Sequence, residues 1–496
     1  MALLPPRLLT GTVTSTIGRL AGTVISVGTI ALITRSFVAT GGPEHGLAAY
    51  GAYATVLAYL AVVTVVADGG FYLVFTREAA HPGADERSLL ETVWRLRVGS
   101  ALAVLLLGSG LAFLLPYSGT IRVGILVGLW GTTFQLGSQL LMGVFQKRLR
   151  LLTPALAEVV GRLVQFVAAV SVAWFQGGVL AFLGAFVAGT FVTFLMNLVG
   201  ARRFVRFRLW GAMDRARAWH LLHEAWPMGI SLILSVIFFK VDSLLLSILR
   251  PPADVALYAL PYKVLESLLF FPAMVGGMLL PVFARASAVD RRQVSPPLRA
   301  AVDLFLLGAL PVSAVVTVAA PWIVGLLGGA PFHAATPVLR ILAVTLGVLF
   351  FGNLFGNAVI AIGEQRRLLR VYAFLTVVNV VVNLAVIPRY SYLGAAWTTL
   401  GTEFLSVFLT AAVLVRRRIP VIGTPSTFRI LLGGAVLILL LFLPIDPLLR
   451  VIVALAGYGI ALFATGVVLP KNLLDLIRAQ RVHGEPSVHG GHPGVS

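Results

Sequence analysis

The sequence predicts an all-α polytopic membrane protein with about 14 transmembrane helices, arranged as two six-helix lobes and two C-terminal helices. Three observations predict this fold class: the composition, a series of long apolar runs, and a repeat that relates the two halves of the chain. Of the 496 residues, 58% are hydrophobic and 11% are charged, whereas a soluble domain carries about 25% charged residues. The composition therefore excludes a soluble globular protein and a disordered chain, and the absence of cysteine excludes a disulfide scaffold.

The apolar runs are long and continuous, unlike the short alternating strands of an outer-membrane barrel. Each approaches the length of about 20 residues that a helix needs to cross a bilayer. The first is interpreted as a retained helix, because it lacks the small-residue cleavage site of a signal peptide. The predicted segments are 12–34, 48–70, 98–116, 121–144, 152–175, 178–199, 227–249, 259–282, 300–327, 337–361, 371–388, 393–415, 428–444 and 450–469.

The distribution of basic residues predicts the orientation of these segments. With the N-terminus in the cytoplasm, 28 of the 38 Lys and Arg residues fall in inward loops, 7 fall on the outward side and 3 lie inside the segments. Inward loops of membrane proteins carry this excess of positive charge. The sequence therefore predicts a multi-pass protein of the cell (inner) membrane with both termini cytoplasmic, and the net charge of +19 reflects topology rather than nucleic-acid binding.

Five regions follow from this topology. Residues 1–200 form an N-lobe, 227–418 a C-lobe, and 419–470 the last two helices. The basic stretch 201–226 is either a solvated cytoplasmic linker or a segment lying on the anionic inner leaflet. The tail, 471–496, is rich in Gly, Pro, His and Ser, which predicts a disordered cytoplasmic segment without a metal site.

The repeat appears when the two halves are compared at an offset of 208 residues, where positions 50–80 hold nine identities without a gap. Its most informative pairs are Tyr50 with Tyr258, Gly69 with Gly277, Phe75 with Phe283 and Arg77 with Arg285. Because six segments separate the copies, both run in the same direction. Such halves are related by an axis along the membrane normal and enclose a cavity that opens alternately to each side, which favours a transporter.

Several short motifs resemble a known family. They are Thr34-Arg35-Ser36 followed by Gly46–Tyr53, Ala67-Asp68-Gly69-Gly70, Thr76-Arg77-Glu78-Ala79-Ala80, Lys240-Val241-Asp242 and Leu280–Arg285. Together they resemble the signatures of Wzx-like oligosaccharide flippases of the MOP superfamily, which also holds lipid II flippases and MATE drug exporters. The chain departs from that pattern at Phe37–His45, which predicts a longer loop broken by Gly and Pro. Asp68, Gly69, Arg77 and Arg285 are the structural residues of these motifs.

The resemblance implies a flippase that moves a polyprenyl-pyrophosphate-linked oligosaccharide from the inner to the outer leaflet by alternating access, in cell-surface polysaccharide biosynthesis. It implies membrane lipids as partners, with a polysaccharide polymerase and glycosyltransferases as further candidates. No cofactor is expected. Coupling to an ion or to the membrane potential is possible, since an inside-negative potential drives an anion outward by about 2.3 kcal/mol per charge per 100 mV.

Three cations inside the segments are candidate ligands for the pyrophosphate: Arg19, Arg162 and Lys240. Arg19 lies on a small, polar helix face and either binds the head group, reaches the inner surface or pairs with an acid of another helix. Arg162 lies four residues after Glu158, so the two can neutralise each other along one helix. Lys240 and Asp242 are about 200° apart on a helix and so point to nearly opposite sides.

The acids inside the segments are candidate counter-charges or coupling sites: Asp242, Glu158, Glu266 and Glu403. Asp68 lies beside two glycines at an inner end, where it is expected to order a turn and pair with Arg77.

Two other functions remain open at this stage. A cation-coupled drug exporter on the same fold needs acids and aromatics that face a cationic drug, and the three cations argue against it. A membrane glycosyltransferase or polymerase needs a large outer loop with paired acids, which the topology does not provide. No catalytic constellation or metal-ligand spacing stands out, so the chain is not expected to be an enzyme.

Overall fold

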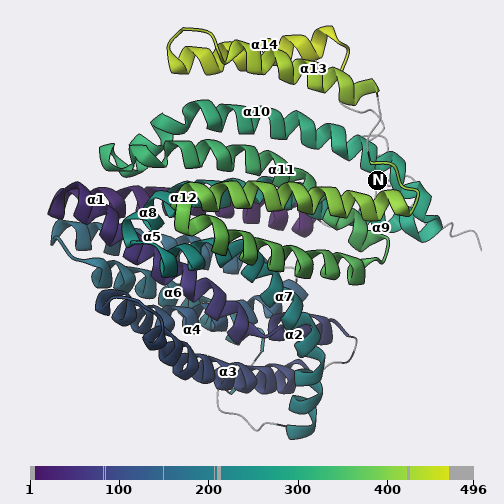
Figure 1. Ribbon diagram of the computed structural model, residues 1–496. Helices are drawn as coiled ribbons and strands as arrows, with labels where there is room; N and C mark the ends of the chain where they lie inside the picture. Colours follow the sequence, from purple (N-terminus) through teal and green to yellow (C-terminus); the bar gives the residue numbers. More distant parts are fainter. Residues whose placement is uncertain are drawn as a thin grey trace, which may run out of the picture.

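The computed structural model describes residues 6–467 apart from 82, 84, 149, 206, 209–213 and 422–424, and it leaves out the side chains of 6–17, 19 and 425. All regular structure in these residues is helical (Figure 1). The helices are α1 (Pro6–Asp68), α2 (Phe71–Ala80), α3 (Glu86–Leu114), α4 (Gly119–Lys147), α5 (Leu152–Trp174), α6 (Val179–Arg202), α7 (Arg215–Leu249), α8 (Pro252–Leu268), α9 (Phe270–Val289), α10 (Ser295–Gly328), α11 (Thr336–Ala361), α12 (Gln365–Arg416), α13 (Pro425–Leu440) and α14 (Pro447–Ala464), with short 3-10 helices at Arg291–Val294 and Ala330–Ala335.

Ten helical stretches within the described residues are long and apolar enough to cross a membrane. The chain is therefore an all-α multi-pass membrane protein. The predicted segment 259–282 is divided between α8 and α9. The segment 121–144 lies in α4, and 428–444 extends four residues past the end of α13 at Leu440.

Two of the helices each contain a sharp reversal. Gly42 of α1 has φ 80°, and Ser391 of α12 has φ 50°. Glycine adopts a positive φ readily because it has no Cβ, whereas the Ser391 hydroxyl donates a hydrogen bond to Asp254. Each helix therefore contains two predicted segments. The predicted loop at Phe37–His45 is wrong: helix continues on both sides of Gly42.

The predicted linker 201–226 is shorter than expected. Helix α6 continues to Arg202, and α7 begins at Arg215, where the Asp214 side chain accepts hydrogen bonds from the backbone N–H groups of Ala216 and Arg217. This capping satisfies donors that a helix start leaves free. The polar first turns of α7 read as a linker because they lack a continuous apolar run.

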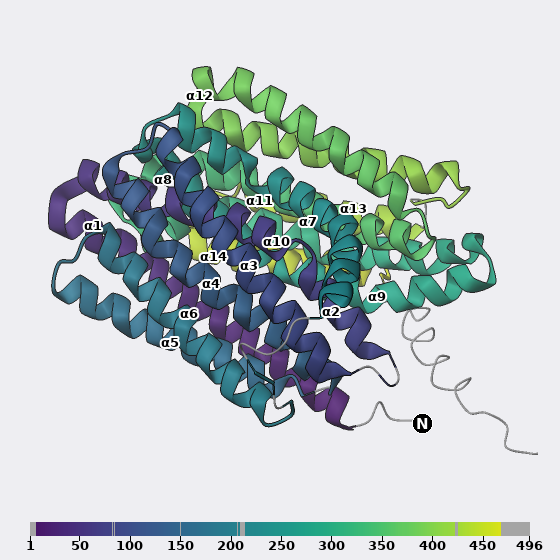
Figure 2. The same ribbon diagram turned by 90° about the horizontal axis from the view of Figure 1, so that it is seen from below.

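The predicted topology provides names for the two ends of the bundle. The outer end is the one that holds Gly42 and Ser391, and the inner end is the one that holds Asp68 and Arg202. The N-terminal half is α1–α6 and the C-terminal half is α7–α12. Figure 1 shows α13 and α14 stacked beyond α10, on the side away from α3 and α4. Figure 2 gives the view turned by 90°, in which α5 and α6 lie alongside each other.

Small residues allow the helices to approach closely, as is common in membranes. A Cβ at Gly189 of α6 would lie 2.7 Å from the Gly161 carbonyl oxygen of α5. One buried apolar core joins the two halves and includes Tyr50 of α1, Leu257 of α8 and Phe332 of the second 3-10 helix. The fold thereby places α1 against α8, and α8 carries the charged residues described next.

Candidate substrate and coupling site

Two lysines and one glutamate form a charged group between α7 and α8, which we call the lysine site (Lys240, Lys263, Glu266). The Lys240 Nζ donates to the Glu266 carboxylate, and the Lys263 Nζ lies 3.0 Å from Glu266 Oε2. The Lys240 Nζ also lies 4.8 Å from the ring centroid of Tyr262, a cation–π contact. With two cations and one acid, the lysine site carries a net charge of +1.

The lysine site lies on two helices of the C-terminal half, α7 and α8, that both pack against α1 of the N-terminal half. Its charged side chains remain 20–45% exposed. A partly exposed excess of positive charge in the membrane interior suits an anionic ligand.

The sequence reasoning missed Lys263, which it counted among the outward basic residues. Its spacing of three residues from Glu266 is the signal that could have linked the two. The contact between Lys240 and Glu266 has no such local signal, because 26 residues separate them.

A second group of polar side chains surrounds Asp242, which is 1% exposed. One oxygen of its carboxylate accepts hydrogen bonds from Thr399 (2.6 Å) and Tyr258 (3.2 Å), and the other accepts one from Asn383 Nδ2 (2.9 Å). Asn383 also donates to Asn379 at 2.5 Å. These residues come from α7, α8 and α12, and we call them the Asp242 cluster.

The residues bonded to Asp242 are all uncharged. Tyr258, Asn383 and Thr399 bond to it directly, and Asn379 is linked to it through Asn383. Glu403 of α12 lies nearby, is 4% exposed, and has no ion-pair partner among the described residues. The Oδ1 atom of Asn383 is buried without a hydrogen-bond partner. Buried acids and an orphaned amide oxygen next to each other are costly unless a proton or a cation joins them.

Lys240 and Asp242 have different partners, although both side chains contact α8. Lys240 pairs with Glu266 of α8, whereas Asp242 accepts hydrogen bonds from Tyr258 of α8 and Thr399 of α12.

In the N-terminal half, Arg162 and Glu158 form the ion pair that their spacing predicts, with Nη2 and Oε1 2.6 Å apart. Arg162 Nη1 donates to the Gly22 carbonyl oxygen of α1 at 2.9 Å and to the Ser26 hydroxyl. These bonds tie α5 to α1. The side chain of Arg19 lies outside the described residues, so its role stays a prediction.

The expected pairing of Asp68 with Arg77 is wrong. The partner of Asp68 is Arg97 of α3, which also donates to Gln139 of α4 at 3.0 Å. Arg97 is 3% exposed and Asp68 6%, so the pair holds α1, α3 and α4 together. Arg77 pairs with Glu78 and with Glu224 of α7.

The remaining motif residues differ in surroundings. Gly69 has φ 53° and lies at the junction of α1 and α2. Arg285 is exposed on α9 and makes no side-chain ion pair or hydrogen bond within the described part of the chain.

The two halves contact each other at both ends. At the outer end, Thr34 donates to the Leu327 carbonyl oxygen, and the rings of Tyr50 and Phe332 are 5.7 Å apart. At the inner end, Arg77 pairs with Glu224. These contacts join α1 to α10 and to the second 3-10 helix at the outer end, and α2 to α7 at the inner end. Among the residues described, no group of three or more His, Asp or Glu could hold a metal ion.

Comparison with known proteins gives two family matches. The model of the family "Polysaccharide biosynthesis protein" matches residues 9–287, more than half of the chain. The "MatE" family model matches residues 227–385. A search of curated proteins finds no match.

Solved structures show a similar fold. The chain is similar to the lipid II flippase MurJ in an inward closed conformation, with a TM-score of 0.74 and 14% identity, covering 91% of this chain and 98% of that one. An inward-facing multidrug resistance MATE family transporter of the MOP superfamily has a TM-score of 0.65 and 16% identity, covering 81% of this chain and 98% of that one. A MOP superfamily transporter from Pyrococcus furiosus, described as having a binding pocket of reverse polarity, has a TM-score of 0.58 and 17% identity, covering 82% of this chain and 95% of that one.

Proposed function

Since the chain belongs to the polysaccharide biosynthesis protein family of the MOP superfamily, which consists of transporters and not of enzymes, we propose that it is a lipid-linked oligosaccharide flippase. Its substrate is a glycan on polyprenyl pyrophosphate, which it moves from the inner to the outer leaflet by alternating access. The sugar and pyrophosphate cross between the two halves while the lipid tail stays in the bilayer.

The observation that carries this proposal is the lysine site. A pyrophosphate loses its hydration when it enters the membrane, and a nearby excess of positive charge offsets that cost. Lys263 and Lys240 share Glu266, so each ammonium keeps donors free for an anion. Arg19 is a second candidate at the inner end, whereas the bonds of Arg162 to α1 support a structural role.

The test uses vesicles that contain the purified protein and a polyprenyl-pyrophosphate glycan with a fluorescent sugar. A glycosidase added outside removes the label only from the external leaflet, so the fraction removed measures transfer. Lys263→Gln removes the net charge of the lysine site but leaves the bond between Lys240 and Glu266. We expect it to lower transfer at limiting substrate about tenfold, the value of one charge-assisted hydrogen bond.

Two variants serve as controls in that assay. Lys263→Arg keeps the charge and should retain transfer, and Arg389→Gln removes an exposed charge of α12 that is not part of the lysine site. Normal transfer by Lys263→Gln would contradict the role of the lysine site. Absence of transfer by the wild type with every polyprenyl-pyrophosphate glycan would contradict the proposed substrate class.

The Asp242 cluster supports coupling to a monovalent cation. Asp242, Asn383 and Thr399 provide oxygen atoms from two helices, and oxygen is the ligand that hard cations prefer. A bound cation would neutralise Asp242 and would be coordinated by the otherwise unpartnered Oδ1 of Asn383. Because the cluster joins α7, α8 and α12, occupancy would change how these helices pack.

A second candidate function is a cation-coupled drug exporter. Two observations favour it: the match of residues 227–385 to the MatE family model, and the buried acids Asp242 and Glu403. Both acids are buried, whereas the charged side chains of the lysine site are 20–45% exposed. A cationic drug would therefore meet positive charge first, which favours the flippase.

We further propose fourteen crossings, with twelve in two parallel six-helix lobes. The reversals at Gly42 and Ser391 make α1 and α12 cross twice, so the ten long apolar stretches give twelve crossings. Helices α4 and α13 give the other two. Both termini then face the cytoplasm of the cell membrane. Because the chain has no cysteine, Thr120→Cys at the outer end and Ser88→Cys at the inner end test this topology with an impermeant maleimide, which should label only the former in intact cells.

A further inference from the structure

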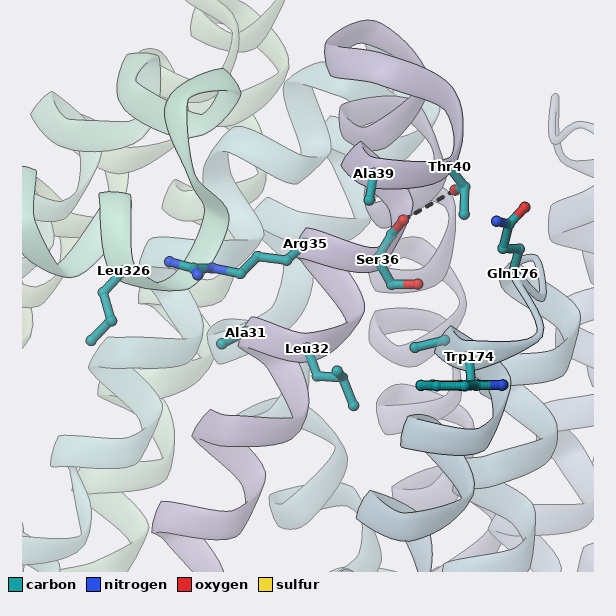
Figure 3. A pocket seen from close by; sticks show the side chains of 10 residues that line it. Ala31, Leu32, Arg35, Ser36, Ala39, Thr40, Trp174, Gln176 and Leu326 are labelled. Carbon is teal, nitrogen blue, oxygen red and sulfur yellow. Dashed lines mark hydrogen bonds between the residues drawn. The ribbon is translucent and has the colours of Figure 1, made fainter.

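A pocket of about 610 Å³ opens at the outer end of α1, between the α5–α6 turn and the end of α10. Figure 3 shows its residues: Arg35 reaches toward Leu326, Ser36 lies in the middle, and Trp174 and Gln176 come from the turn on the other side. Leu32 and Ala31 lie on α1 beneath them. None of the residues that line it is acidic.

Most of the polar groups in this pocket have hydrogen-bonding capacity to spare. The exposed Arg35 guanidinium makes one long hydrogen bond, 3.4 Å from Nη2 to the Gly325 carbonyl oxygen. The side chains of Ser36 and Gln176 make none to the described residues. Thr40, by contrast, donates to the Ser36 and Phe37 carbonyl oxygens. A guanidinium, a hydroxyl and an amide are thus left to bind a ligand.

The α5–α6 turn holds Gln176 in an unusual backbone conformation. Its φ is 53°, a value that favours glycine, and Gly177 follows directly. A non-glycine residue at such a position costs on the order of 1 kcal/mol. The turn closes with the Gly177 N–H donating to the Val172 carbonyl oxygen at 2.8 Å. The neighbouring Trp174 is 83% exposed, so its ring offers a flat apolar face at the edge of the pocket.

The pocket also lies on the outer seam between the two halves. Thr34 and Arg35 of α1 donate to the Leu327 and Gly325 carbonyl oxygens at the C-terminal end of α10. The carbonyl groups at the end of a helix carry partial negative charge, so these donors help to hold the seam closed, although the Gly325 oxygen also accepts from the Gly329 N–H at 3.0 Å. An anion in the pocket would compete with α10 for Arg35.

We propose that this pocket is an exit site that binds the phosphate and first sugars of the exported head group on the outer side. This inference rests on the proposed function and deepens it. Arg35 pairs with the phosphate, because a guanidinium matches phosphate oxygens geometrically. Trp174 stacks on an apolar face of a sugar ring, and Gln176 and Ser36 bond its hydroxyl groups. Binding there draws Arg35 from α10 and loosens the outer seam.

The test uses a thiol reporter at the rim. Ala39→Cys introduces the only thiol of the chain at an exposed position of the pocket, and Thr120→Cys places one at the outer end of α4 as the matched control. Each variant in a nanodisc is labelled with an impermeant maleimide, with and without a polyprenyl-pyrophosphate glycan. We expect the glycan to slow labelling of the Ala39→Cys thiol at least fivefold and to leave the control unchanged.

Further substitutions in the Ala39→Cys background assign the contacts. Arg35→Gln should raise the glycan concentration needed for protection about tenfold, as loss of a charge-assisted bond predicts, and Trp174→Leu should also raise it. Arg389→Gln and Trp397→Leu, which remove exposed side chains elsewhere, should not. A sugar-free polyprenyl pyrophosphate should protect more weakly than the glycan.

Three outcomes would overturn the exit site. Equal protection by phosphatidylglycerol alone would make it a general contact for anionic lipid. Protection that survives Arg35→Gln and Trp174→Leu would place the ligand elsewhere. Unchanged labelling together with normal glycan transfer by the wild type would refute the exit site but not the proposed function. Absence of glycan transfer by the wild type would refute the proposed function itself.

Discussion

Charged residues inside the helix bundle serve different purposes according to their partners. Arg97 and Asp68 neutralise each other, and Arg97 also donates to Gln139, which makes them a structural pair. Asp242 has only uncharged partners, and the lysine site has one acid for two cations. Structural roles therefore correlate with complete pairing, and the candidate functional groups are those whose charge stays unbalanced.

The buried ion pair predicts a large stability effect. Asp68→Asn leaves Arg97 without its counter-charge, and removing one partner of a buried pair costs about 3 kcal/mol. We expect the free energy of unfolding in detergent, measured by denaturant titration, to fall by about that amount. Arg77→Gln, which breaks the exposed pair with Glu224, should cost less than about 1 kcal/mol. Equal losses in the two variants would contradict the assignment of Arg97 as the partner.

The Asp242 cluster predicts a cation-dependent stability. Sodium chloride should raise the melting temperature of the wild type relative to choline chloride, because a ligand at about 100 times its Kd stabilises the folded state by about 2.7 kcal/mol. Asp242→Asn keeps the shape of the side chain but removes its charge, and it should abolish the difference. Glu44→Gln, at an exposed position, should not. A wild type insensitive to the choice of cation would refute this coupling.

Residue contacts were predictable from the sequence only where they are local. The spacing of Glu158 and Arg162 predicts their ion pair, and the spacing of Lys240 and Asp242 predicts that these two do not neutralise each other. The pairing of Asp68 was mispredicted because Arg77 is nearer in sequence, while Arg97 approaches only when α3 packs against α1. Glu266 and Lys240 meet for the same tertiary reason.

At the scale of elements, most apolar segments were predictable because hydropathy and length are properties of a continuous run. The first turns of α7 were not, since they are polar and rely on the Asp214 cap. Around Gly42 the Gly and Pro residues predict a loop, because they are typical of loop composition. The structure reverses the chain there with a single positive φ at Gly42.

Helix α7 crosses the junction of α1 and α2 in close backbone contact. A Cβ at Gly229 would lie 2.5 Å from the Gly69 carbonyl oxygen, and one at Gly70 would lie 2.7 Å from that of Ala225. Gly229→Ala should therefore push the two halves apart at the inner end. Cross-linking of Arg77→Cys to Glu224→Cys by a short bifunctional reagent, which reports on this contact, should fall severalfold.

The control for that measurement is Gly277→Ala, where an added Cβ meets no atom within 4 Å. It should leave the cross-linking yield unchanged. If Gly229→Ala also leaves it unchanged, the close approach of α7 does not hold the inner end together.

At the scale of the whole molecule, alternating access requires that the outer seam opens. Thr34→Cys with Leu327→Cys places two thiols across the contact between α1 and α10, in a chain that has no other cysteine. Oxidation should abolish glycan transfer, and reduction should restore it. Ala67→Cys with Ser100→Cys joins two helices of the same half and should leave transfer intact. Continued transfer with the outer seam locked would contradict this mechanism.

The most direct test of the central claim is native mass spectrometry of the gently purified protein. The flippase account predicts that a polyprenyl-pyrophosphate glycan copurifies with the wild type and with Arg389→Gln, and that Lys263→Gln loses it while keeping bulk phospholipid. A wild type that carries only phospholipid and binds added cationic drugs would contradict this account and favour the drug exporter.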